Sequence, residues 1–358
     1  MLELVLDKEF INTFHLAYKG NEEYVEDFRK YFIKNLQKLK LVSNYLDIED
    51  IKTQAKDNPL LELIIERIPT LDFQSDLLAQ IDSQDFPVTG SPFKLVLTGE
   101  NTETCNKRRK RFGLEYLNPS NLSDRWKLYF SQRTDISRKT TLDAEIPDEY
   151  KFDSWDKFKS FSHPLNSVII IDFYFLAWKT KNELDINMRN NILPLLEKLM
   201  VEASDEVPVE ILILSEINDK SPTPTQNNRV IESQQKIEVG LKLLTKKKFS
   251  LNIIVHNKMN YPRDFEAFHD RAVITNFFYI ESGKGFNLFR GTGRDNRVDG
   301  NTEVKFRFIF NPQNFYTVFK DLKNLGIYCE KIENNPGRPD YLNYCPQKTN
   351  RLLNIERN

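Results

Sequence analysis

Short apolar runs alternate with stretches of helical periodicity along the first third of the chain. Residues 2–7 predict a buried strand that ends in an acid, and residues 93–98 predict a second strand after the turn at 90–92. The apolar spacing between them predicts three helices, at 21–41, 60–68 and 76–81, the last with Ser75 as its N-cap. Strands separated by helices indicate a parallel α/β sheet.

A second alternating pattern begins near residue 161. Strands are predicted at 167–172, 209–214, 250–255, 272–281, 285–289 and 304–310, and helices at 190–200, 232–246 and 314–325. Residues 126–160 are less periodic and rich in charge, so we interpret them as a connector. The prediction is therefore an α/β domain at 1–125, a connector at 126–160, and a second α/β domain with a C-terminal tail at 161–358.

Composition supports this division and narrows the class of protein. A length of 358 residues suits two domains, and 40% hydrophobic residues can fill two cores. No apolar run approaches the roughly 18 residues of a membrane span, and the first residues carry acids where a signal peptide needs bases. We therefore expect a cytoplasmic protein without a membrane span. Cys105, Cys329 and Cys345 are too scattered for a disulfide framework or a zinc site, so we expect reduced thiols.

Charge is distributed unevenly along the chain. Residues 1–90 hold 10 Lys and Arg against 17 Asp and Glu, whereas the remainder holds 41 against 35. An acidic first part suits metal binding and a basic remainder suits phosphate contact, although chance surface composition explains the asymmetry equally well.

Acids stand where predicted strands end in the first domain. Asp7 ends one strand, Glu100 follows the next, and Asp76 starts the helix before it. Carboxyl ends of parallel strands meet at one edge, and carboxylates gathered there would bind Mg²⁺ or Mn²⁺. In the alternative interpretation, Asp7 caps a helix and the other acids are solvated.

This arrangement resembles the PIN-like nuclease fold. The matching parts are Leu-Val-Leu-Asp7, Ser75-Asp76-Leu-Leu-Ala-Gln, the strand that leads to Thr98-Gly-Glu100, and the segment at 113–119 as a closing strand. The resemblance covers residues 1–125. It implies that Asp7, Asp76 and Glu100 are metal-binding catalytic acids of a nuclease, with Glu62 or Glu66 as a fourth candidate. Glu100 stands where the family usually has Asp.

A phosphate-binding motif is suggested near the end of the second domain. His269, Arg271, Asn276 and Gly283-Lys284 keep the spacing of the phospholipase D motif, with Arg271 for Lys, Asn276 for Asp and Lys284 for Ser. Residues 160–310 more closely resemble the phospholipase D-like domain of MIT-domain proteins. That resemblance implies a binding module in which Arg271 and Lys284 contact phosphate. His269 is a candidate nucleophile or, alternatively, a structural histidine.

Basic residues cluster just beyond Glu100. The cluster consists of Lys107, Arg108, Arg109, Lys110 and Arg111. Such clusters attract phosphate backbones, so we expect contact with nucleic acid here, although a charge run is also typical of a solvated helix face.

Three functions follow from these features. The leading hypothesis is a metal-dependent nuclease module coupled to a phosphate- or partner-binding module, which by analogy suits bacterial phage defence or control of mobile elements. The second is a non-catalytic adaptor that binds a phosphorylated ligand or a protein partner. The third is a metal-independent phosphodiesterase in which a homodimer pairs two copies of His269.

Overall fold

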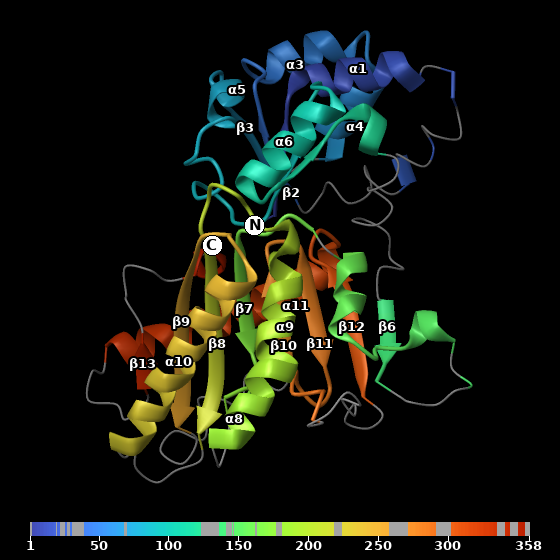
Figure 1. Ribbon diagram of the computed structural model, residues 1–358. Helices are drawn as coiled ribbons and strands as arrows, with labels where there is room; N and C mark the ends of the chain where they lie inside the picture. The colour runs from blue at the N-terminus through green and yellow to red at the C-terminus, as the bar shows by residue number, and fades with distance from the viewer. Residues whose placement is uncertain are drawn as a thin grey trace.

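Two α/β modules, each built on its own sheet, make up the molecule (Figure 1). The computed structural model describes residues 2–18, 20, 21, 26, 29, 30, 39–67, 70–122, 136–140, 145, 147–161, 163–176, 181–217, 224–257, 271–290, 302–334, 341–343 and 350–354. The predicted α/β class is confirmed. Among the described residues, no helix combines the length and the apolar character that crossing a membrane requires.

The first sheet is entirely parallel, with strand order β3-β2-β1-β4-β5. Its strands are β1 (Leu2–Leu6), β2 (Leu39–Ser43), β3 (Thr70–Phe73), β4 (Lys94–Leu97) and β5 (Glu115–Leu117). The helices around it are α1 (Lys8–Tyr18), α3 (Ile48–Ala55), α4 (Pro59–Arg67), α5 (Leu77–Gln80) and α6 (Thr102–Phe112).

Alternation along β1 assigns the two faces of this sheet. Leu2, Leu4 and Leu6 belong to the apolar cluster that holds Phe10 of α1 and Ile64 of α4. Val5 belongs instead to the cluster formed with Leu77 of α5 and with Cys105 and Phe112 of α6. Each helix therefore buries its apolar face on one side of the sheet.

Two strands of this module were not predicted. The helix expected at 21–41 is wrong at its end, because residues 39–43 form β2 and pair with β1. Helical spacing of Leu36 and Leu39 suggested a helix, but Leu39, Leu41 and Val42 are buried as an inner strand of the sheet. Most of 21–38 lies outside the described residues. The N-cap of α5 is Asp76 rather than Ser75.

The second sheet is mixed, with order β13-β9-β8-β7-β10-β11-β12-β6 among the described strands. Strands β7, β8 and β9 are parallel, and the others pair antiparallel. The bounds are β6 (Ile136–Lys139), β7 (Ser167–Ile171), β8 (Val209–Ile217), β9 (Phe249–Asn257), β10 (Arg271–Thr275), β11 (Phe278–Ser282), β12 (Glu303–Phe308) and β13 (Tyr341–Asn343).

Helices cover both faces of the second sheet. In Figure 1, α8 (Lys181–Asn187), α9 (Leu193–Leu199) and α10 (Pro224–Leu244) lie in front of it, and a π-helical turn, Met188–Ile192, joins α8 to α9. The opposite face receives α11 (Pro312–Glu333), which starts earlier and ends later than predicted, and the short 3₁₀ helix Arg351–Leu353.

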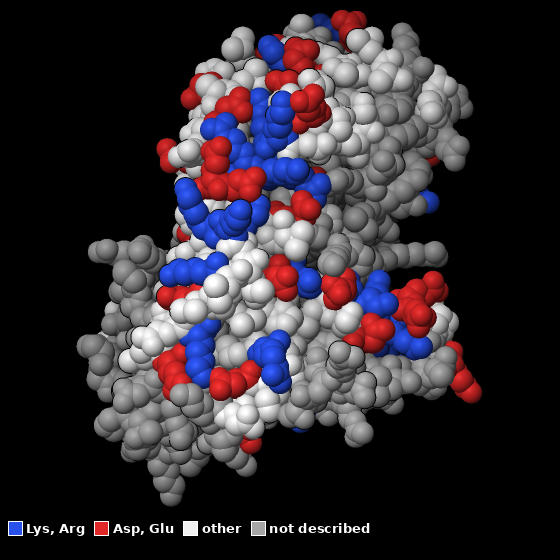
Figure 2. Space-filling model, viewed as in Figure 1, with Lys and Arg blue, Asp and Glu red and all other residues white. Residues whose placement is uncertain are grey.

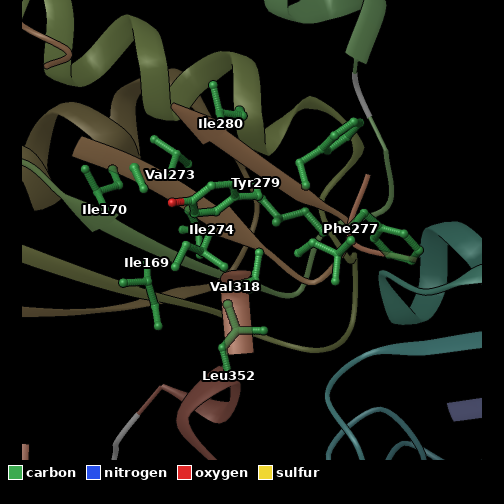
Figure 3. Close-up of a cluster of buried hydrophobic side chains, with 14 of the residues drawn as sticks. Ile169, Ile170, Val273, Ile274, Phe277, Tyr279, Ile280, Val318 and Leu352 are labelled. Atoms are coloured by element: carbon green, nitrogen blue, oxygen red, sulfur yellow. The ribbon is translucent and has the colours of Figure 1, made fainter. Parts of the chain in front are cut away.

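Apolar side chains that are neighbours across strands β7, β10 and β11 form the two faces on which these helices pack. Ile170, Val273 and Ile280 are register neighbours on one face, whereas Ile169 and Ile274 lie on the other (Figure 3). On that second face, Val318 of α11 and Leu352 of the 3₁₀ helix lie below the strands in Figure 3. The core of the module is therefore two layers deep, one on each side of β7 and β10.

Residues 285–289 do not form the strand that was predicted there. The chain leaves β11 through a turn at Gly283 and Lys284 and continues irregularly, with only a single bridge at Phe289. The amide of Asn191 explains this path: its Oδ1 accepts from the backbone N–H groups of Leu288 and Phe289, at 3.0 and 2.8 Å. These backbone groups are satisfied by a side chain instead of a neighbouring strand.

Part of the predicted connector belongs to the second module. Residues 136–139 form β6, which pairs with β12. Trp155, in the 3₁₀ helix Trp155–Phe161, is 6% exposed, and its Nε1 donates to the Asn190 carbonyl at 2.7 Å. Its ring packs against Phe152, Phe158 and Phe289.

The amino ends of the two sheets meet where the modules join. Gly113, just before β5, contacts Leu165, just before β7. Phe93, just before β4, packs edge-on against Phe315 of α11, with ring centroids 5.5 Å apart. Ligand sites of α/β sheets lie at the carboxyl ends of the strands. Because the amino ends meet at the junction, the carboxyl edges of the two sheets face away from each other (Figure 1).

Candidate functional site

Asp7 lies at the carboxyl end of β1, as predicted, and its carboxylate is already bonded within the protein. It is 4% exposed. Its Oδ1 accepts from Asn44 Nδ2 and Glu9 N, at 3.2 and 3.1 Å, and its Oδ2 accepts from Thr98 Oγ1 and Gly99 N, both at 3.3 Å. The side chain therefore ties β1 to the ends of β2 and β4.

The other predicted metal-binding acids are not gathered around Asp7. Asp76 is exposed at the start of α5, and Glu100 is exposed with Oε1 3.7 Å from Arg108 Nη2. Glu62 and Glu66 are exposed on α4. Among the described residues, no group of three His, Cys, Asp or Glu side chains is arranged to hold a metal ion. These acids therefore do not fit the divalent cation that the resemblance implies.

The basic cluster 107–111 is largely engaged in ion pairs. The pairs are Lys107–Glu103 at 2.7 Å, Arg108–Asp82 at 2.8 Å, Arg109–Glu115 at 3.7 Å and Arg111–Glu206 at 2.7 Å. Lys110 is exposed. Figure 2 accordingly shows blue and red atoms interleaved over α6.

The basic cluster follows Glu100 closely in sequence, but it does not lie at the carboxyl edge of the sheet, where Asp7 is. Helix α6 runs from that edge toward the junction of the modules, and the Arg111 carbonyl accepts from Ser204 Oγ at 2.6 Å. Arg108 is 9% exposed, with both Nε and Nη2 on Asp82 at 2.8 Å. The described ion pairs of the arginines are thus structural: they join α6 to the segment after α5, to β5 and, across the junction, to Glu206.

A second acid, which was not among the predicted site residues, organises the carboxyl edge of the second sheet. Asp172 directly follows β7 and is 0% exposed. Its Oδ1 accepts from Tyr174 N at 2.9 Å and its Oδ2 from Phe286 N at 2.5 Å. Burial raises the pKa of Asp172 to about 6, and these two hydrogen bonds and the charge of Arg271 oppose the rise.

Arg271 is the cation beside this acid, at the first position of β10. Its Nη1 donates to the Gly283 carbonyl at 2.7 Å, and its guanidinium carbon lies 4.9 Å from the centre of the Tyr174 ring. Its Nε is buried without a hydrogen-bond partner. Among the described residues, Nη2 makes no hydrogen bond either. The guanidinium is held in place while part of its donor capacity stays unused.

The turn after β11 closes over Asp172 and requires a glycine. Gly285 has φ +86°, and a Cβ there would lie 2.7 Å from Asp172 Oδ2 and 2.9 Å from Arg271 Cδ. Lys284, in the same turn, is exposed. The predicted phosphate-binding pair, Arg271 and Lys284, therefore lies on one strand start and the adjacent turn. We name Asp172, Tyr174, Arg271 and residues 283–286 the Asp172 site.

Of the two other positions of the phospholipase D-like motif, the structure describes Asn276 but not His269. Asn276 lies at the opposite end of β10, where its Nδ2 donates to the Gly113 carbonyl at 2.9 Å and its Oδ1 accepts from Asn166 N at 3.2 Å. It therefore supports the junction. His269, predicted as a nucleophile, lies outside the described residues. Asp172 could have been found by the rule that selected Asp7, because both are acids directly after a strongly apolar strand.

The chain matches no protein-family model and shows no significant similarity to a curated protein.

Proposed function

We propose that the second module binds a phosphate-bearing ligand at the Asp172 site, so that the chain acts as a binding protein. The observation that carries this proposal is the arrangement of Arg271: its guanidinium is fixed by Gly283 and Tyr174, and its Nη2, which makes no hydrogen bond among the described residues, is left to donate beside the turn that carries Lys284. Guanidinium groups with free, preorganised N–H donors are the usual partners of phosphate oxygens.

The role of Asp172 in this proposal is to preorganise the site. Its two oxygens hold the backbone at Tyr174, whose ring packs on the guanidinium, and at Phe286, in the turn next to it. Because a charged group that is already oriented loses less entropy on binding, the acid lowers the cost of phosphate capture. Its negative charge also keeps Arg271 from being an isolated cation before the ligand arrives.

The proposal is tested by titrating the full chain with inorganic pyrophosphate and following binding by calorimetry. We expect saturable binding that weakens at least about tenfold in Arg271→Ala, the loss of one charge-assisted contact. Arg271→Lys should recover only part of it, because Lys cannot form two parallel bonds. Lys151→Ala is the control, because Lys151 bridges to Lys139 of the edge strand β6, three strands away from β10. Equal affinities in Arg271→Ala and the control would refute the proposal.

A second proposal is the nuclease activity of the first module, and the position of Asp7 favours it. The order β3-β2-β1-β4-β5 reverses direction between β1 and β4, and Asp7 lies at that switch point, where α/β sheets commonly bind ligands. Since both of its oxygens already accept bonds from Thr98, Gly99 and their neighbours, a cation there would have to displace these donors.

The nuclease proposal is tested with end-labelled single-stranded RNA and DNA in the presence of Mg²⁺ or Mn²⁺. Cleavage that disappears in Asp7→Asn would support it, provided that far-UV circular dichroism shows the variant folded. Asp57→Asn, an exposed acid between α3 and α4, serves as the control. Cleavage that persists in folded Asp7→Asn, or no cleavage by the unaltered chain, would refute it.

A further inference from the structure

A polar pocket lies in the first module, away from both strand edges discussed above. It occupies about 280 Å³ between the face of the first sheet that carries Val5 and the segment from Gln74 to Gly90. Four buried residues form its floor: Glu3, Val42, Phe86 and Lys94. More exposed polar residues, among them Gln80 and Asp85, line its rim.

The cation on the floor of the pocket, the ammonium group of Lys94, already donates hydrogen bonds to other groups of the protein. Lys94 is 2% exposed, and its Nζ donates to the Phe86 carbonyl at 2.6 Å and to the Thr89 carbonyl. Its remaining donor capacity is directed toward Glu3, with Nζ 3.9 Å from Oε1. Burial lowers the pKa of Lys94 to about 8, against the effect of Glu3. Lys40 also lines the pocket and pairs with Asp72, with Nζ 3.1 Å from Oδ2. An anionic ligand would therefore meet two ammonium groups that are already paired within the protein.

The acid on the floor, by contrast, has acceptor capacity left. The Glu3 side chain is 9% exposed, and among the described residues its carboxylate accepts only one hydrogen bond, from Ser91 N at 3.3 Å. A carboxylate offers about four lone-pair sites. On the rim, the Asp85 carboxylate accepts no hydrogen bond from the described residues. Lys40, Gln74 and Gln80 also line the pocket and carry N–H groups, but among the described residues none of them donates to Glu3. Acceptor sites of the Glu3 carboxylate therefore remain for the N–H donors of a ligand.

Charge and size define what would supply them. A full cation at Glu3 would be repelled by Lys94, only 3.9 Å away, whereas a neutral N–H donor would not. Val42 and Phe86 supply apolar surface at the floor. The volume is at the small end of ligand clefts, so it suits a single heterocycle rather than a chain.

We infer that this pocket binds an amino-substituted nucleobase, whose exocyclic amino group donates to the Glu3 carboxylate. A carboxylate that accepts from an amino group is the same pairing by which acidic side chains recognise cytosine. The inference is independent of the proposed phosphate binding, because it concerns the other module and other residues.

The experiment is calorimetric titration of the full chain with two matched pairs of nucleosides, cytidine with uridine and adenosine with inosine. Each pair differs by replacement of the exocyclic amino group, so we expect the amino-bearing member of at least one pair to bind about tenfold more tightly. A single-stranded trinucleotide with the same base tests whether the base is read free or within a strand. Equal affinities within both pairs, or binding of spermidine without any nucleoside, would overturn the inference.

Variants locate the binding. Glu3→Gln should weaken nucleoside binding at least about tenfold, because the amide offers one acceptor in place of two. Since this change also removes the counter-charge of Lys94, Asp85→Asn on the rim provides a second variant that breaks no ion pair of the described residues. Asp57→Asn is the control. Unchanged affinity in folded Glu3→Gln and Asp85→Asn would also overturn the inference.

Discussion

Gly113 and Leu165 touch through their backbones where the two modules meet. A Cβ on Gly113 would lie 2.4 Å from the Leu165 carbonyl oxygen, and the glycine has φ +64° as the C-cap of α6. Two amide side chains reinforce the contact, because Asn166 and Asn276 both donate to the Gly113 carbonyl, at 3.3 and 2.9 Å. The end of α6 is thereby fixed to the start of β7.

We predict that Gly113→Ala lowers the free energy of unfolding by about 2–4 kcal/mol. The left-handed backbone alone costs a residue with a Cβ about 1–2 kcal/mol, and the collision is with a carbonyl that side-chain rotation cannot remove. Urea denaturation at 25 °C measures the change. Gly326→Ala in α11 is the control: nothing lies within 4 Å of its Cβ, so helix propensity should raise stability by about 0.5–1 kcal/mol. Similar effects of both substitutions would contradict this view of the junction.

A second prediction separates structural from solvated charges on α6. Arg108 is 9% exposed and makes two bonds to Asp82, whereas Lys107 and its partner Glu103 are both highly exposed. We expect Arg108→Ala to lower the free energy of unfolding by about 1–3 kcal/mol, and Lys107→Ala to change it by less than about 0.5 kcal/mol. Urea midpoints of the two variants compare them directly. Equal losses of unfolding free energy in the two variants would show that the Arg108–Asp82 pair stabilises the fold no more than the exposed Lys107–Glu103 pair does.

The strands that sequence analysis located are those with strong apolar runs. Residues 167–171 and 209–214 fall within β7 and β8, and the run before Asp7 is β1. In the first module the missed strands are β2 and β3, and at the start of β2 the helical spacing of Leu36 and Leu39 competes with strand alternation. What decides between the two is pairing with β1, which lies 37 residues away in sequence and leaves no local signal.

In the candidate sites, too, contacts between residues distant in sequence could not be predicted. Asp7 was correctly placed at a strand end, and its bond from Glu9 N at the start of α1 matches the alternative in which Asp7 caps a helix. The donors at Asn44, Thr98 and Gly99 are distant in sequence, so these hydrogen bonds could not be anticipated. The motif spacing predicted that Arg271 and Lys284 contact the same ligand. In the structure, the β10–β11 hairpin and the turn after it bring both residues to one site. Asp172 reaches the same site through the hydrogen bond from Phe286 N, a contact across 114 residues that leaves no local signal in the sequence.

A third prediction concerns the segment first interpreted as a connector. Trp155→Ala should lower the free energy of unfolding by about 3–5 kcal/mol, because the ring is buried among three phenylalanines. Trp155→Phe keeps much of the packing but loses the bond to the Asn190 carbonyl, and should cost about 1–2 kcal/mol. Urea denaturation followed by far-UV circular dichroism provides both values. A loss below 1 kcal/mol for Trp155→Ala would mean that this segment is dispensable to the core.

The last prediction concerns pH and Asp172. Its pKa in the folded chain is about 6, above the ordinary value of 3.8, so the folded protein holds this proton more tightly than the unfolded chain. Stability from this group is therefore greatest below about pH 4, falls as pH rises, and reaches its lower limit above pH 6. Relative to Asp172→Asn, which cannot ionise, the unfolding free energy of the unaltered chain should fall by about 2 kcal/mol between pH 4 and pH 7.

The comparison is made by urea denaturation of both chains at each pH, and the difference between them isolates Asp172 from all other titrating groups. The asparagine has one acceptor for two N–H donors, at Tyr174 and Phe286, so Asp172→Asn should be the less stable chain at pH 4. The gap should narrow or reverse by pH 7. Glu149→Gln, an exposed acid of the same module, should show no such change in the difference. A gap that widens from pH 4 to pH 7 would mean that Arg271, rather than burial, dominates the environment of Asp172.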